Sequence, residues 1–217
     1  MRYDGVIFDN DGVLIELYRP GKKYERAIRE LLNEKGINPD KKAIKSLMPY
    51  HKVNEIKKTC NRYNLNSEKF WREHEEKTYQ VQKQTILDGY KTLFADVEHI
   101  ENIGVPKGIV SNNQEDIVEF IAERHSSIDF QTFYGREKSL KGLWRRKPNT
   151  YYLKKCIDDM GLENPIYIGD SSKDIEAAHK LGIDSVFVRR EHREGYYTTK
   201  NPTHEIKSLE ELPKIVS

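Results

Sequence analysis

Short, continuous runs of apolar residues bounded by turn residues are spaced along the chain. The clearest runs lie at residues 6–8, 165–169 and 185–188. Apolar runs of about four to eight residues are typical of strands buried on both faces of a parallel sheet. Residues 105–110 predict a further strand, although Lys107 and Gly108 weaken its apolar pattern, and residues 130–134 predict a short one.

Segments with helical periodicity separate these strands from residue 89 onward. Apolar residues recur every three or four positions, which predicts helices near residues 90–102, 114–124, 147–160, 170–181 and 208–216. Strands that alternate with helices in this way are typical of βαβ units. The chain therefore predicts an α/β fold with a Rossmann-like core, a doubly wound parallel sheet.

Residues 21–84 differ from the rest, because their pattern is helical almost throughout and contains no convincing strand. Four helices are expected there, near residues 24–35, 39–48, 53–63 and 67–81. They interrupt the core between its first strand and its second. We therefore expect residues 1–15 and 88–217 to form the core and residues 16–87 to form an inserted α-helical cap.

The connections on either side of the helical insertion are rich in turn residues, Tyr18-Arg19-Pro20-Gly21 before it and Leu87-Asp88-Gly89 after it. Two such crossings would act as hinges if the insertion moved as a lid over an α/β active site. The alternative is an ordinary helical subdomain that does not move. The abundance of such lids favours motion.

Polar side chains follow three of the predicted strands at the point where each strand ends. The carboxyl ends of parallel strands lie at one edge of a sheet, where open α/β folds bind their ligands, so these side chains are candidates for one site. A lysine that precedes a predicted helix joins them. The candidates are Asp9, Asp11, Ser111, Asn112, Lys147, Asp170 and Asp174.

The candidate set combines several carboxylates with a lysine, a hydroxyl and the starts of helices. Carboxylates that gather repel one another unless a cation lies among them, and Mg²⁺ binds one or two carboxylates together with waters and phosphate oxygens. Lysine, hydroxyl and backbone N–H groups suit an incoming phosphate. The set therefore favours Mg²⁺-dependent phosphoryl transfer, in which a carboxylate can be the nucleophile.

Each candidate taken alone also has an ordinary structural explanation. Asp9 and Asp11 fit an Asp-rich turn after a strand, and Lys147 is one of many lysines in the chain. Helix capping accounts for three others, Ser111, Asp170 and Asp174. One shared site explains all of them together, whereas the separate explanations require four independent coincidences in sequence order.

Four segments resemble, in order, the four motifs of the haloacid dehalogenase superfamily. They are Phe8-Asp9-Asn10-Asp11-Gly12-Val13-Leu14, Ile109-Val110-Ser111-Asn112, Lys147-Pro148 and Ile168-Gly169-Asp170-Ser171-Ser172-Lys173-Asp174. The arrangement covers nearly the whole chain, and the helical insertion resembles the C1 cap of that superfamily. No single motif is specific, but their order makes the resemblance strong.

The resemblance implies roles for the two aspartates of the first motif. Asp9 would attack phosphorus and bind Mg²⁺ through its other oxygen. Asp11 would protonate the leaving alcohol, then activate the hydrolytic water, and its backbone carbonyl would touch the metal. A halide leaves unprotonated, whereas an alkoxide needs a proton, and such general acid help accelerates a reaction about 10²–10⁴-fold. Asp11 therefore favours a phosphate ester over a carbon–halogen bond.

The remaining motifs imply a phosphate and metal site. Ser111 and Lys147 would bind phosphate oxygens, Lys147 would also hold the carboxylate of the nucleophile, and Asn112 would offer its backbone N–H. Asp170 would be a direct Mg²⁺ ligand. Asp174 would support the metal directly or through water.

These expectations describe a Mg²⁺-dependent phosphatase for a small phosphate monoester, closest in function to the phosphoglycolate phosphatases. A sugar-phosphate isomerase resembling β-phosphoglucomutase is the first alternative, because it would use the same two aspartates and return the phosphoryl group to a sugar. A non-enzymatic phospho-acceptor module is a weaker alternative, since such modules lack both the cap and the second aspartate.

Composition and charge exclude several other classes. The net charge is only +2 and the basic and acidic residues are mixed, so the chain lacks an electrostatic footprint for nucleic acid. No apolar run approaches membrane-spanning length, and a secretory signal is absent. The two cysteines, Cys60 and Cys156, lack metal-type spacing and fit a reducing compartment. We expect a cytoplasmic protein without nucleic-acid or membrane partners.

Two polar runs outside the motifs are interpreted as surface segments, the first as a solvated basic loop and the second as a mixed-charge run. The alternatives are closure over a substrate for the first and a binding site for the second. One is Trp144-Arg145-Arg146, directly before Lys147, and the other is Arg189-Arg190-Glu191-His192-Arg193. Mixed charges without apolar periodicity are typical of exposed segments.

Overall fold

A computed structural model of the chain describes residues 2–18, 21–48, 50–124 and 127–217. The chain divides into two compact units. The core unit contains Met1–Leu17, Lys91–Arg136 and Arg145–Ser217, and the helical unit contains Tyr18–Tyr90 and Glu137–Trp144. Arg19 and Pro20, part of the predicted first connection, lie outside the described residues.

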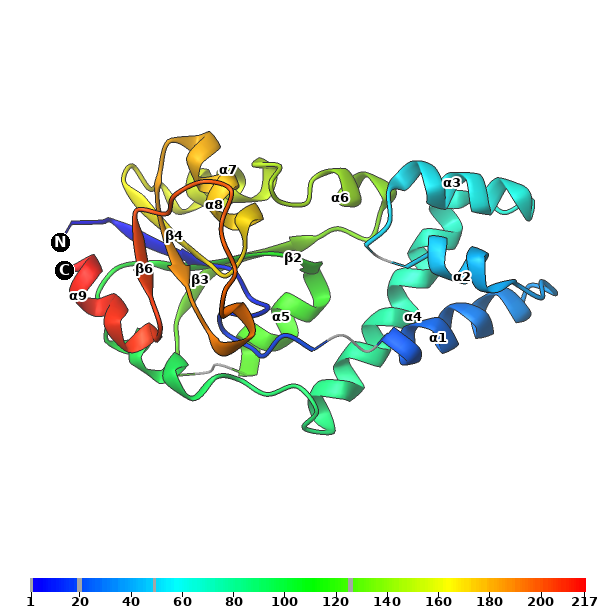
Figure 1. The fold of residues 1–217 in the computed structure, drawn as a ribbon, viewed down its shortest axis with the longest axis horizontal. Helices are drawn as coiled ribbons and strands as arrows, with labels where there is room; N and C mark the ends of the chain where they lie inside the picture. The colour runs from blue at the N-terminus through cyan, green and yellow to red at the C-terminus, as the bar shows by residue number, and fades with distance from the viewer. Residues whose placement is uncertain (1, 19–20, 49, 125–126) are drawn as a thin grey trace. The chain divides into compact units, whose positions relative to one another are not determined.

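In the described part of the core unit, six strands form one parallel sheet in the order β3-β2-β1-β4-β5-β6 (Figure 1). The chain adds two strands on one side of β1 before it returns to add the others on the opposite side. The end of β1 is therefore the point where the strand order reverses, at which open α/β sheets bind ligands. The sheet confirms the predicted α/β class. The strands are β1 (Gly5–Phe8), β2 (Lys107–Gln114), β3 (Phe130–Arg136), β4 (Pro165–Gly169), β5 (Asp184–Val188) and β6 (His204–Ile206).

Helices cover both faces of this sheet. Val6 and Phe8 of β1 belong to one apolar cluster, and Ile7 between them belongs to another. The first cluster includes residues of η1 (Ala95–Asn102), α5 (Glu115–Arg124), η3 (Leu209–Glu211) and α9 (Leu212–Val216), and the second includes residues of α7 (Tyr151–Met160) and α8 (Ser172–Leu181). Burial of both faces explains why the strands are continuous apolar runs.

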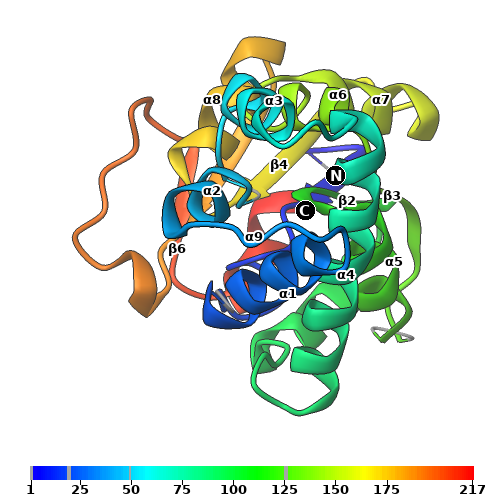
Figure 2. The same ribbon diagram turned by 90° about the vertical axis from the view of Figure 1, so that its right-hand side faces the viewer.

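The helical unit is built from amphipathic helices around its own apolar cluster, with α1 packed beside α4 (Figure 2). Leu140 and Leu143 of the short helix α6 belong to the same cluster, which explains why residues 137–144 are part of this unit although they follow β3. The helices are α1 (Gly21–Asn33), α2 (Lys41–Ser46), α3 (Val53–Arg62), α4 (Ser67–Leu87) and α6 (Leu140–Trp144).

The helix expected at residues 90–102 is shorter than predicted and is a 3₁₀ helix, η1. The residues before it are extended instead, because they pair with the chain that follows β1. Thr92 accepts a hydrogen bond from the backbone N–H of Glu16 at 2.9 Å and donates its own N–H to the Glu16 carboxylate at 3.1 Å. Leu93 forms an isolated bridge with Ile15. These long-range contacts override the local helical pattern.

The helix expected from Lys147 begins instead at Tyr151. Asn149, which precedes the N-cap residue Thr150, accepts the backbone N–H of Tyr151 at 2.9 Å. The strand expected at 105–110 extends to Gln114, and Lys107 is buried in it with its ammonium donating to the carbonyl of Ile103 at 2.6 Å.

Three elements were not predicted, α6, β6 and η2 (Glu191–Arg193), because each is too short to show a period. None of the described helices is long and apolar enough to cross a membrane.

Candidate active site

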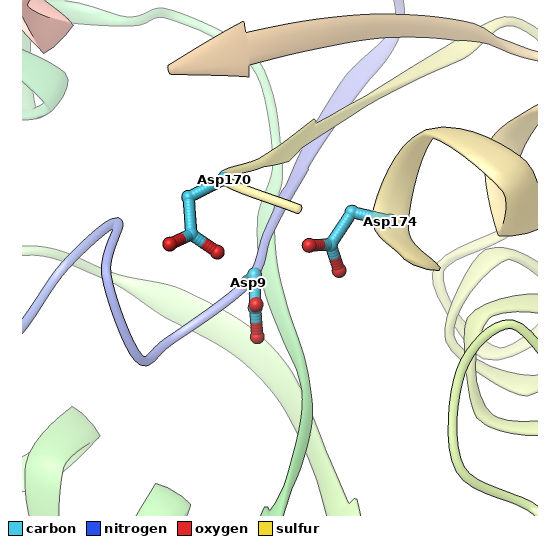
Figure 3. Close-up of side chains that lie close together, drawn as sticks. All are labelled: Asp9, Asp170 and Asp174. Carbon is cyan, nitrogen blue, oxygen red and sulfur yellow. The ribbon is translucent and has the colours of Figure 1, made fainter. Parts of the chain in front are cut away.

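Three buried carboxylates come together at the carboxyl edge of the sheet (Figure 3). Asp9 follows β1, Asp170 follows β4, and Asp174 lies in the first turn of α8. One oxygen of each carboxylate lies within 4.8 Å of one oxygen of the other two. All three residues are at most 8% exposed. We call Asp9, Asp170 and Asp174 the acidic cluster.

Two glycines allow the carboxylates to approach so closely. A Cβ atom at Gly169 would lie 2.2 Å from the Cβ of Asp174, so α8 can start beside the end of β4 only because residue 169 lacks a side chain. A Cβ at Gly12 would lie 2.2 Å from Oδ2 of Asp170, and Gly12 also has a φ of +86°. Both glycines are therefore required by the geometry of the cluster.

Lys147 links two members of the acidic cluster. Its ammonium lies 2.8 Å from Oδ1 of Asp9 and 2.6 Å from Oδ1 of Asp174, and it donates to the carbonyl of Val110 at 3.0 Å and to the hydroxyl of Tyr167. Burial alone would lower the pKa of Lys147, but Asp174 and Asp9 outweigh burial and raise it. The lysine is therefore a fixed positive charge within the cluster.

The surroundings of Asp9 disfavour the ionised form of its carboxyl group. Burial raises its pKa, as do the neighbouring carboxylates of Asp174 and Asp170, and Lys147 only partly opposes them, so the pKa is well above its usual range. Oδ1 of Asp9 accepts hydrogen bonds from Lys147 at 2.8 Å and from the backbone N–H of Asn10 at 2.7 Å. Among the described residues, no hydrogen bond to its Oδ2 is found.

Asp11 has a different environment from Asp9. Its Oδ1 is bonded to the ammonium of Lys91, and its Oδ2 accepts from the side-chain amide of Asn113 at 2.9 Å. Burial would raise the pKa of Asp11, but Lys91 and Asn113 outweigh it, and the pKa is below its usual value. Lys91 is only 4% exposed. Sequence reasoning missed this lysine, because it lay inside a predicted helix with nothing to mark it.

Ser111 and Asn112 lie in β2 beside the end of β1. The register pairs Phe8 with Ile109, so the two residues lie just beyond the last paired position. Asn112 holds the backbone of Lys147 from both sides, accepting its N–H at 2.6 Å and donating to its carbonyl at 3.1 Å. Its side chain therefore fixes the loop that carries Lys147, a contact that the sequence motif did not suggest. The hydroxyl of Ser111 accepts the N–H of Asn113 at 3.1 Å.

The polar run at residues 189–193, which includes η2 (Glu191–Arg193), has Glu191 and His192 exposed, but its side chains also contact carboxylates of the core unit. Nε2 of His192 and Nε of Arg193 lie 2.8 and 2.9 Å from Oδ2 of Asp170. Arg190 forms two hydrogen bonds of 2.9 Å with the carboxylate of Asp96. The sequence interpretation missed these contacts, because the acidic partners are distant in the chain and leave no local pattern.

The family model of haloacid dehalogenase-like hydrolases matches residues 6–188. This span holds the whole acidic cluster and Lys147. The chain belongs to the haloacid dehalogenase-like hydrolase family. The resemblance found from the four motifs is thereby confirmed. No curated protein matches this hydrolase.

Solved structures share the fold of this hydrolase at low sequence identity. A 2-haloacid dehalogenase from Pseudomonas syringae pv. Tomato DC3000 has a TM-score of 0.64 and 16% identity, covering 99% of this chain and 98% of that one. A predicted phosphoglycolate phosphatase from Haemophilus somnus 129PT has a TM-score of 0.62 and 17% identity, covering 100% and 99%. A protein described as a β-phosphoglucomutase from Thermotoga maritima has a TM-score of 0.54 and 15% identity, covering 98% of each chain. One fold thus carries several reactions, so the reaction of this hydrolase must be argued from its site.

The acidic cluster of this hydrolase fits a divalent metal ion. Its carboxylates are bonded to two permanent cations among the described residues, Lys147 and Arg193, so one negative charge remains. Burial is the first cause of the raised pKa of Asp9, and the neighbouring carboxylates of Asp174 and Asp170 add to it. Clustered carboxylate oxygens suit hard cations such as Mg²⁺. Asp174 is already engaged, because its Oδ1 bonds Lys147 and its Oδ2 accepts the N–H of Ser171 at 3.0 Å.

Proposed function

We propose that this protein hydrolyses a small phosphate monoester with Mg²⁺ through a phosphorylated Asp9, as phosphoglycolate phosphatases do. The observation that carries the proposal is the pair of aspartates directly after the central strand. Lys147 fixes one of them, and Lys91 with Asn113 fixes the other. The proposed reaction needs two carboxylates in different roles, one as the nucleophile and one as the acid–base group.

In the first half of the reaction, Asp9 attacks the phosphorus atom of the ester. A bond forms between a carboxylate oxygen of Asp9 and phosphorus, and the bond between phosphorus and the alkoxide oxygen breaks. Oδ1 of Asp9 is held by Lys147 and the N–H of Asn10. This fixes the carboxylate before substrate arrives, and such positioning lowers the entropic part of the barrier.

Asp11 serves as acid and then as base in this proposal. It gives a proton to the leaving alkoxide, and in the second half it takes a proton from the water that attacks the phosphorus on Asp9. That attack breaks the bond between phosphorus and the Asp9 oxygen, which releases inorganic phosphate and restores the Asp9 carboxylate. Lys91 and Asn113 both donate to Asp11, so the arrangement in the structure is that of the carboxylate, the form that acts as base. The acid form requires that at least the contact with Lys91 be released.

Mg²⁺ would be held by Asp9 and Asp170, with Asp174 acting on the site through Lys147 and the start of α8. When bound, the ion supplies positive charge that neutralises the oxygens of the transferred phosphoryl group. Ser111 and Lys147 would bind the same oxygens, and Asn112 would hold the Lys147 loop.

The test is a panel of phosphate monoesters assayed for released inorganic phosphate, with Mg²⁺ and with EDTA. The proposal predicts phosphate release that EDTA abolishes and that the Asp9→Asn variant lacks. Asp158→Asn, at an exposed aspartate of α7 paired with Lys154, is the matched control and should retain full activity. Conversion of a sugar phosphate without phosphate release would establish the mutase alternative. A phosphorylated protein that never turns over would establish the phospho-acceptor alternative.

A further inference from the structure

The acidic cluster has one member whose contacts the proposed reaction leaves unexplained. Asp170 is 2% exposed, and its Oδ2 accepts hydrogen bonds from two side chains of η2, His192 at 2.8 Å and Arg193 at 2.9 Å. Because a carboxylate only accepts, His192 carries a proton on Nε2. No described residue donates to Oδ1 of Asp170. The described residues therefore hydrogen-bond one oxygen of the Asp170 carboxylate and not the other.

The space around Oδ2 is closed on a further side. A Cβ at Gly12 would lie 2.2 Å from this oxygen and 3.1 Å from Nε2 of His192, so the chain after β1 lies directly against the pair. Oδ2 thus accepts two hydrogen bonds and lies against the backbone of Gly12. A carboxylate held in this way cannot rotate about its last bond without losing both hydrogen bonds.

The segment that supplies the donors is itself anchored to the core unit. Arg190 bonds Asp96 twice at 2.9 Å and donates to the carbonyl of Val13 at 2.7 Å. Arg189 donates to the carbonyl of Arg193 at 3.2 Å. These contacts fix η2 relative to the chain that follows the nucleophile, so the donors are placed by the fold.

We propose that His192 and Arg193 are positioning residues for the cation site, which hold Oδ2 of Asp170 and reserve Oδ1 for the divalent cation. The inference rests on the proposed Mg²⁺ dependence and extends it to residues outside the four motifs. Partners of this kind orient a metal ligand, and their loss typically weakens metal binding about 10–100-fold.

The positive charge of Arg193 by itself would weaken metal binding, because one cation near Asp170 repels another. A role through charge alone would therefore make metal binding tighter when Arg193 is removed. The test must separate the hydrogen bond from the charge. Glutamine and methionine do this, because in both the fourth side-chain atom replaces the donor nitrogen, as an N–H donor in glutamine and as a methyl group in methionine.

The experiment compares Arg193→Gln with Arg193→Met and His192→Gln with His192→Met. Binding of Mg²⁺ to each purified protein is measured by isothermal titration calorimetry without substrate. The inference predicts that each methionine variant binds Mg²⁺ about 10-fold or more weakly than its glutamine partner. His179→Met, at an exposed histidine of α8, should bind like the unchanged protein. Thermal unfolding without Mg²⁺ checks that each variant is folded.

Equal Mg²⁺ affinity in the glutamine and methionine variants would overturn the inference, as would tighter binding in the methionine variants. A raised KM with unchanged Mg²⁺ affinity would also overturn it and make Arg193 a substrate-binding residue. Failure of the unchanged protein to bind Mg²⁺ would refute the proposed cation dependence itself, and the inference with it. The calorimetry of the unchanged protein therefore distinguishes the two failures.

Discussion

The regions around Asp9 and Asp11 differ sharply although the two residues are separated by one position. Asp9 lies among two other carboxylates with one lysine, and its pKa is raised by burial and by Asp174 and Asp170. Asp11 has a lysine and an amide as partners, and its pKa is lowered in spite of burial. The partners come from other parts of the chain. In the proposed reaction, the division between nucleophile and acid–base group is therefore set by tertiary neighbours.

Replacing Lys147 by Met should have the largest effect on the Asp9 region. It leaves Asp9 and Asp174 buried without their cation, and breaking such a buried pair typically costs about 3–5 kcal/mol. Denaturant unfolding without Mg²⁺ measures this cost. Lys154→Met, at an exposed lysine of α7, is the control and should change stability little. A Lys147→Met protein as stable as the control would show that Lys147 does not offset the charge of the cluster.

Replacing Asp11 by Asn should impair both halves of the reaction. With an alkyl phosphate, turnover should fall about 10²–10⁴-fold, because the alkoxide leaves without a proton. With p-nitrophenyl phosphate, whose leaving group needs no proton, the first half should proceed while the second is slow. Stopped-flow absorbance should then show a burst of about one nitrophenolate per enzyme. Equal losses with both substrates and no burst would contradict the assigned role.

Replacing Lys91 by Met should change the Asp11 region while leaving the Asp9 region intact. Lys91 lowers the pKa of Asp11, so its removal should raise that pKa. Whether Asp11 limits the rate as acid or as base, the corresponding limb of the pH–rate profile should move to higher pH. The profile of kcat/KM measures the shift. A profile that stays in place would show that Lys91 does not control the protonation of Asp11.

Replacing Tyr167 by Phe should have the smallest effect. The hydroxyl accepts from Lys147 and donates to the carbonyl of Val110 at 2.9 Å, so its loss removes one buried partner of the lysine. We expect a loss of about 1 kcal/mol in the free energy of unfolding and a modest drop in kcat. A loss as large as that of Lys147→Met would mean that Tyr167, more than the carboxylates, holds the lysine in place.

The parts of the site that lie at strand ends could be predicted from the sequence. Asp9 and Asp170 directly follow apolar runs, and the parallel sheet brings such ends to one edge whatever the details of packing. Four of the five described helices of the helical unit, α1 to α4, were also predictable, since apolar residues recur at helical spacing in and around each of them.

The partners of these residues could not be predicted in the same way. Lys91 lies in a bend, and His192 and Arg193 lie in the three-residue helix η2. Each of the three pairs with a carboxylate far away in the chain. A polar run such as residues 189–193 has the same local pattern on a surface as it does beside an active site. The start of α7 was predicted too early, at Lys147, for a similar reason. Asn112 of β2, which is distant in the chain, holds the backbone of Lys147.

The central claim of the proposed reaction is that Asp9 carries the phosphoryl group. The direct measurement uses the Asp11→Asn variant mixed with p-nitrophenyl phosphate and Mg²⁺, quenched in acid and analysed by peptide mass spectrometry. We predict one phosphoryl group on the peptide that contains Asp9, and none when Asp9 is also replaced by Asn. A phosphoryl group on another residue, or nitrophenolate release without any phosphorylated peptide, would contradict the account.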